Sequence, residues 1–159
     1  MLENIIEIKE ITRMLESKIQ SDTLVAMKNS DKFKVSVLRM LKSAIQAEKI
    51  NAKNELTDAN IVAIIKKQIK QRTDSIFEYE KYNRPDMVET LQAEIKILEE
   101  YLPKQLTSEE TKEAVLRIMS NYPNATIKDM GKIMKEASSS LGSVADMSEV
   151  SKIIKNSLV

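Results

Sequence analysis

The sequence predicts an all-α fold, and three features carry that prediction. Only two of its 159 residues are glycine and three are proline, well below the usual shares of about 7% and 5%, so a sheet with many turns is not expected. Apolar residues make up 42% and charged residues 31%, which is typical of a folded globular chain. Through most of the sequence the apolar residues recur three or four positions apart, which is the spacing of amphipathic helices.

The first predicted helix runs from Leu2 to about residue 28, where Asn29-Ser30-Asp31 interrupts the pattern. Residues 1–13 are interpreted as an N-terminal extension, because Met14 would serve as an alternative start. Asp31 is well placed to cap a second helix over about 32–50, since aspartate is among the preferred N-cap residues.

A loop over 51–56 precedes a third predicted helix, which Thr57 caps and which continues to about residue 82. At 1.5 Å per residue this helix spans roughly 38 Å, about the diameter of a domain. The turn that follows places Pro85 at the first position of a fourth helix, which ends near Tyr101. Because that turn is short, the third and fourth helices are predicted to lie antiparallel as an αα-hairpin.

Three short helices are predicted after Pro103, over about 108–120, 126–139 and 147–158. Two capping boxes and a threonine mark their starts: Thr107 with Glu110, Thr126, and Asp146 with Glu149. We therefore predict a long-helix N-terminal subdomain that contains the hairpin, followed by a small three-helix C-terminal subdomain. The boundaries are 1–13 for the extension, 14–103 for the first subdomain and 104–159 for the second.

The chain contains no histidine and no cysteine, which excludes several classes of site. Zinc and copper sites depend mainly on imidazole and thiolate ligands, and Ser–His and Cys–His nucleophile pairs need the missing base. Gly131 and Gly142 are too far apart for a glycine-rich phosphate loop. Adjacent acids such as Glu99 and Glu100 do not face each other on a helix. We expect no catalytic residue, no cofactor and no metal in this chain, and no intrinsic catalysis.

Membrane insertion is not expected, because no run approaches the ~18 apolar residues of a membrane span. Acids interrupt the first residues, unlike a secretory signal or an acid-poor mitochondrial presequence. The lack of cysteine fits a reducing compartment. We expect a cytoplasmic protein, or an organellar matrix protein if the source is eukaryotic.

Local charge is more informative than the net charge of +1. Residues 32–53 hold six basic residues and one acidic, a net of +5, and residues 61–73 carry +4 with no acid. Residues 86–101 carry −4. The basic segments have two interpretations. They form a phosphate-binding surface, or they are solvated helix faces that pair with the acidic fourth helix.

Four strings resemble a known family in their order and spacing. They are VLRMLKSAI over 37–45, IKQR over 69–72, ILEEYLPKQL over 97–106 and IKDMGKIM over 127–134. Together they resemble the GatB/YqeY family, over about Met14 to Val159. These are small proteins similar to the C-terminal tail of the B subunit of glutamyl/aspartyl-tRNA amidotransferase.

The resemblance implies an all-helical protein that acts as a tRNA-binding or accessory module. Amidotransferase or synthetase proteins are then the expected protein partners, and a carbon–nitrogen ligase activity with glutamine as amide donor is associated with the family rather than with these residues. Local charge and the matched strings give one set of candidate RNA-binding residues: Arg39, Lys42, Lys66, Lys70, Gln71, Arg72, Lys128 and Lys132.

One stretch departs from the family pattern. The family shows Gly-Arg-Ala-Asp near the last turn, whereas this chain has Gly142-Ser143-Val144-Ala145-Asp146 and lacks the arginine. If that arginine contacts RNA in the family, the contact is lost here; otherwise Asp146 serves only as a helix cap. The alternative hypothesis is a helical protein-interaction module with no RNA role, in which a hinge around Pro103 lets two helical blocks hold a partner.

Overall fold

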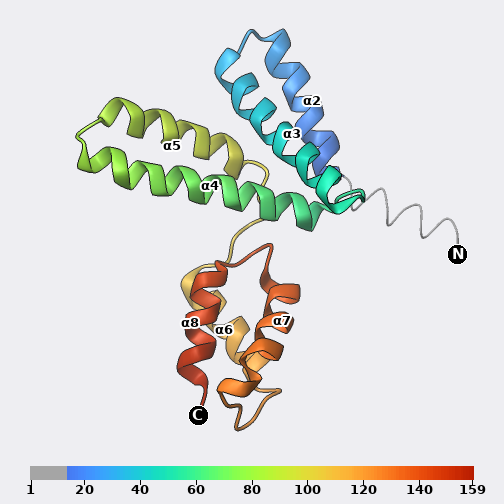
Figure 1. Ribbon diagram of the computed structural model, residues 1–159, viewed down its shortest axis with the longest axis vertical. Coiled ribbons are helices and arrows are strands. Elements are labelled where there is room, and N and C mark those ends of the chain that lie inside the picture. Colours follow the sequence, from blue (N-terminus) through green and yellow to red (C-terminus); the bar gives the residue numbers. More distant parts are fainter. Residues whose placement is uncertain (1–13) are drawn as a thin grey trace, which may run out of the picture. The chain divides into compact units, whose positions relative to one another are not determined.

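A computed structural model describes residues 14–159, and within them the chain is all-α, as predicted (Figure 1). This part contains seven α-helices, a short 3-10 helix and no strand. The helices are α2 (Met14–Lys28), α3 (Lys32–Ala52), α4 (Asp58–Lys81), α5 (Pro85–Glu99), α6 (Ser108–Met119), η1 (Ile127–Asp129), α7 (Met130–Leu141) and α8 (Met147–Ser157). The proposed extension 1–13, and with it the helix expected from Leu2, lies outside the described residues. The chain divides into two compact units, one ending at Leu102 and the other beginning at Pro103.

The first unit is built from two helical hairpins, α2 with α3 and α4 with α5 (Figure 1). Their apolar faces meet in one core, in which Leu38, Ile61 and Leu98 are fully buried. Tyr101, just after α5, is also buried, and its hydroxyl donates a hydrogen bond of 2.6 Å to Asp22 Oδ2 on α2. The last residues of this unit are therefore tied to its first helix.

The predicted start signals of the first unit are confirmed. Asp31 Oδ1 accepts a hydrogen bond of 3.0 Å from the backbone N–H of Lys34, as an N-cap does. Thr57 caps α4 and forms a reciprocal box with Asn60. Pro85 is the first residue of α5, where its missing N–H costs nothing. These local signals fix where the basic helices α3 and α4 begin.

In the second unit α6, α7 and α8 enclose a separate core around Val115, Ile133 and Val150. The capping box of Thr107 with Glu110 is confirmed, because the two residues exchange hydrogen bonds of 2.9 and 3.2 Å.

Two predicted helix starts in this unit need correction. Asp146 caps α8 by accepting from the N–H of Ser148, the second residue of the helix, so it is an N-cap but the predicted box with Glu149 does not form. Thr126 opens the 3-10 turn η1, and the α-helix itself begins four residues later at Met130. Asp129 Oδ2 accepts from the N–H of Thr126 at 2.8 Å, which holds that tight turn in place. A short side chain three residues on favours this kind of local closure.

Across residues 14–159, no helix combines the length and the apolar character that crossing a membrane requires.

Candidate nucleic-acid interface

Helix α3 presents exposed cations among its core residues. Leu38 and Leu41 are fully buried, whereas Arg39 and Lys42, each next in the chain to one of them, are exposed to solvent. Neither side chain makes an ion pair with any residue from 14 to 159. Both charges are therefore available to an anionic ligand.

Two other lysines of α3 are held by carboxylates of the same unit. Lys34 Nζ lies 3.3 Å from Glu100 Oε2. Lys49 Nζ lies 2.6 Å from Glu16 Oε1 and 3.2 Å from Glu55 Oε2. The hydrogen bond that Lys49 donates to Glu16 is the largest cause that raises the pKa of Lys49, and the bond to Glu55 adds to it. These lysines tie α3 to its neighbours, so the +5 of this segment overstates the charge offered to a ligand.

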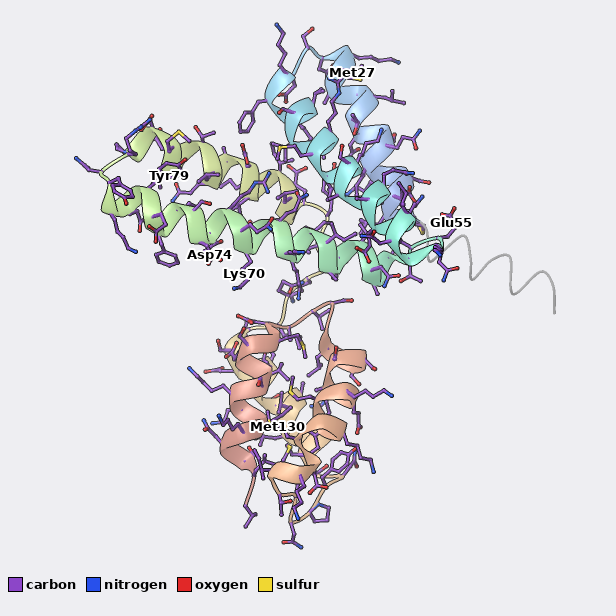
Figure 2. The ribbon with its side chains drawn as sticks, viewed as in Figure 1. Met27, Glu55, Lys70, Asp74, Tyr79 and Met130 are labelled. Atoms are coloured by element: carbon purple, nitrogen blue, oxygen red, sulfur yellow. The ribbon has the colours of Figure 1, made fainter. Side chains whose placement is uncertain are left out.

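On α4, Lys70 and Gln71 are exposed. Lys66 is half-buried and already interacts with another group of the protein. Figure 2 shows Lys70 and Asp74 on the side of α4 that faces away from α5. Lys70 Nζ lies 3.9 Å from Asp74 Oδ2, but the two side chains are 75% and 66% exposed. Such exposed pairs are worth about 0–1 kcal/mol, so Lys70 can exchange this partner for a phosphate.

Arg72 does not belong to this surface, which corrects the expectation for that residue. It is only 7% exposed. Its Nε donates a hydrogen bond of 2.6 Å to Glu94 Oε2 on α5, and its Nη1 donates to the carbonyl of Gln68 at 3.3 Å. The acidic fourth predicted helix thus neutralises this cation, and Arg72 joins the two arms of the hairpin instead of facing solvent.

The second unit exposes Lys128 on η1 and Lys132 on α7. Lys132 Nζ lies 5.7 Å from the centre of the Tyr122 ring, within the range of a cation–π contact. The Tyr122 hydroxyl donates a hydrogen bond to Glu136, and that bond is the main cause that raises the pKa of Tyr122. Lys128 and Lys132 lie four residues apart in the chain, and both are exposed to solvent.

The structure therefore places two pairs of predicted cations on single helices, Arg39 with Lys42 on α3 and Lys66 with Lys70 on α4. In the second unit Lys128 and Lys132 lie on two consecutive elements, η1 and α7. Lys67 is an exposed cation that the sequence analysis did not select. Its position opposite Ile61 and Ile65 in the helical repeat would have indicated its exposure.

The aromatic side chains of Phe77 and Tyr82 are also exposed, at 59% and 75%. No group of three or more acidic side chains suited to a metal ion occurs between residues 14 and 159.

Fold and surface together define a small two-unit helical protein whose exposed cations lie on helix faces. The chain matches the YqeY-like protein family over residues 16–158, nearly its whole length, and it belongs to that family. This family is related to the C-terminal domain of the amidotransferase B subunit.

Fungal relatives carry names that describe inheritance or no function at all. "Altered inheritance of mitochondria protein 41, mitochondrial" of Pyrenophora tritici-repentis is 33% identical over 147 residues, covering 87% of this chain and 77% of that protein. An uncharacterized protein of Schizosaccharomyces pombe is 29% identical over 94 residues, covering 59% of this chain and 76% of that protein. The Kluyveromyces lactis protein with the first of these names is 36% identical over 84 residues, covering 52% of this chain and 45% of its own.

Proposed function

We propose that this protein binds folded tRNA through the phosphate backbone, as an accessory module of tRNA-dependent amidation. The observation that carries the proposal is the outer face of α3, where Arg39 and Lys42 are exposed and have no carboxylate partner between residues 14 and 159. The relation of the YqeY-like family to the C-terminal domain of the amidotransferase B subunit supports tRNA as the class of RNA.

Backbone contact fits the chemistry of these side chains. Lysine and arginine displace counterions from a phosphate backbone, which gives affinity without sequence choice. Lys70 and Gln71 on α4 extend the candidate surface within the first unit, and Lys128 and Lys132 offer a second contact from the other unit. The residues that contact RNA supply positioning only; the amide chemistry is assigned to partner proteins.

The compartment is proposed on a narrower basis. The names of the matched fungal relatives place those proteins in mitochondria. If this chain comes from a eukaryote, we propose the organellar matrix, and otherwise the cytoplasm.

The test is an equilibrium titration of fluorescent folded tRNA with the full chain at several salt concentrations. The test variant carries Arg39→Glu, Lys42→Glu and Lys70→Glu, all at exposed positions. Losing three phosphate contacts is expected to weaken binding at least about a hundredfold at low salt, since each contact contributes to the counterion term.

The matched control changes three exposed lysines elsewhere and alters net charge equally. Its substitutions are Lys96→Glu, Lys112→Glu and Lys152→Glu. The control separates a local surface from a general loss of positive charge. Equal losses in the two variants, or no loss in the first, would reject the surface named here.

A further inference from the structure

An open groove of about 750 Å³ runs between the end of α2 and the first half of α3. Its apolar lining comes from Ala26, Met27, Val35 and Met40. Met27, labelled near the end of α2 in Figure 2, is 49% exposed, and Met40 is 54% exposed. Single exposed apolar residues are common on protein surfaces, but here two exposed methionines line the same groove.

The polar lining of the same groove carries one sign of charge. Lys32 and Arg39 are its two charged residues, and the others are the serines Ser30, Ser36 and Ser43. No carboxylate lines it. Lys32 and Arg39 lie seven residues apart on α3, which is about 10.5 Å along the helix. Two acidic residues seven positions apart on a second helix have the same separation.

These features select one kind of occupant. Flexible methionines accept apolar side chains of varied shape, and amphipathic helices commonly bind such grooves through apolar residues at i, i+3 or i+4, and i+7. An unpaired RNA base would find no aromatic side chain to stack on in this lining.

A second copy of the chain is also a poor occupant. Its acidic helix α5 already packs its apolar face, including the buried Leu98, against the core of its own unit.

We propose that the groove between α2 and α3 binds an acidic amphipathic helix of a partner protein. Apolar side chains of that helix contact Met27 and Met40, and its carboxylates pair with Lys32 and Arg39. This inference goes beyond tRNA binding, and except for Arg39 it rests on side chains that the RNA surface does not use. A partner helix and tRNA would therefore compete only at Arg39.

The test uses a fluorescein-labelled synthetic peptide of about 18 residues, long enough for five helical turns. It has leucines at i, i+3, i+7 and i+10 and glutamates on both flanks. The control peptide has every glutamate replaced by lysine. Binding to the full chain is followed by fluorescence anisotropy, and the contact residues are mapped by amide chemical shifts.

We expect saturable binding of the acidic peptide, with shifts concentrated in residues 26–43, and at least tenfold weaker binding of the lysine peptide. Met40→Glu and Met27→Glu should each weaken binding at least tenfold. Both residues are about half exposed, so neither change disturbs the core. Val25→Glu is the matched control. Val25 is 52% exposed on α2, the helix that carries Met27, but it does not line the groove.

Three results would overturn the proposal. One is the absence of saturable binding up to about 1 mM, where the binding free energy is only about −4 kcal/mol. The second is equal binding of the acidic and lysine peptides. The third is a dimer of the chain alone, seen in sedimentation and abolished by Met40→Glu, because the groove would then belong to a second copy. The triple variant of the RNA surface tests tRNA binding separately.

Discussion

The ion pair between Arg72 and Glu94 supports a quantitative prediction about the α4–α5 hairpin. Replacing Glu94 with alanine leaves the arginine charge buried, because the Arg72 side chain is only 8% exposed. Removing one partner of a buried pair costs about 3–5 kcal/mol. The Glu94 side chain is 21% exposed, so water replaces part of the lost interaction, and the lower end of that range, about 3 kcal/mol, is expected.

Replacing both residues should be far less harmful. Arg72 Nη2 and Gln68 Oε1 are already buried without a hydrogen-bond partner among residues 14–159, so the polar cluster is only partly satisfied. Exchanging a buried pair for apolar residues of similar size is often neutral or stabilising. The double variant Arg72→Met, Glu94→Leu is therefore expected within about 1 kcal/mol of the parent.

The assay is urea denaturation followed by circular dichroism, with amide exchange of α4 and α5 to assign the loss to the first unit. Asp74→Ala is the matched control on the same hairpin, because the Lys70–Asp74 pair is highly exposed and should cost less than about 0.5 kcal/mol. The reasoning is refuted if Glu94→Ala costs no more than Asp74→Ala, or if the double variant is as unstable as Glu94→Ala.

Three further predictions concern the core, a cap and pH. Leu38→Ala should cost about 2–5 kcal/mol by urea denaturation, because Leu38 is fully buried; a cost under about 1 kcal/mol would contradict its place in the core. Thr107→Ala should destabilise the second unit by about 1 kcal/mol in the same assay, whereas an unchanged midpoint would show that the box contributes nothing. Burial raises the pKa of Tyr101, and the hydrogen bond to Asp22 raises it further. The stability that protonated Tyr101 contributes is therefore complete below the unfolded tyrosine pKa of about 10 and is lost as pH rises above it. Tyr101→Phe should therefore flatten the alkaline stability profile, and an unaltered profile would refute this assignment.

Local signals in the sequence were sufficient for most of the fold. Asp31, Thr57 and Thr107 begin helices as predicted, because a cap depends on a few neighbouring residues. The third predicted helix was expected to end near residue 82, and α4 ends at Lys81, because the turn and Pro85 follow directly. The 3-10 turn at η1 was missed because Thr126 and Asp129 satisfy a 3-10 turn as well as an α-helical one.

The candidate site could be predicted less completely, because burial of a charged side chain depends on a partner distant in sequence. Arg72 matched the family string and lay in a basic segment, so it was expected to contact RNA. It is buried instead, because it pairs with Glu94, which lies 22 residues further on. Lys34 and Lys49 likewise pair with carboxylates 66 and 33 residues away. Arg39 and Lys42 are exposed as expected, because no carboxylate between residues 14 and 159 pairs with either of them. The apolar groove was not located from the sequence, because periodicity alone does not show where α2 and α3 leave Met27 and Met40 exposed.

The measurement that tests the central claim most directly is the salt dependence of tRNA binding by the parent and by Lys42→Ala. With about four phosphate contacts, the plot of log affinity against log salt for the parent should have a slope near −3 to −4. Removing one phosphate contact should make that slope shallower by about 1 and weaken binding to all tRNAs alike. An identical slope in the variant, or no binding of tRNA by the parent at low salt, would contradict the account.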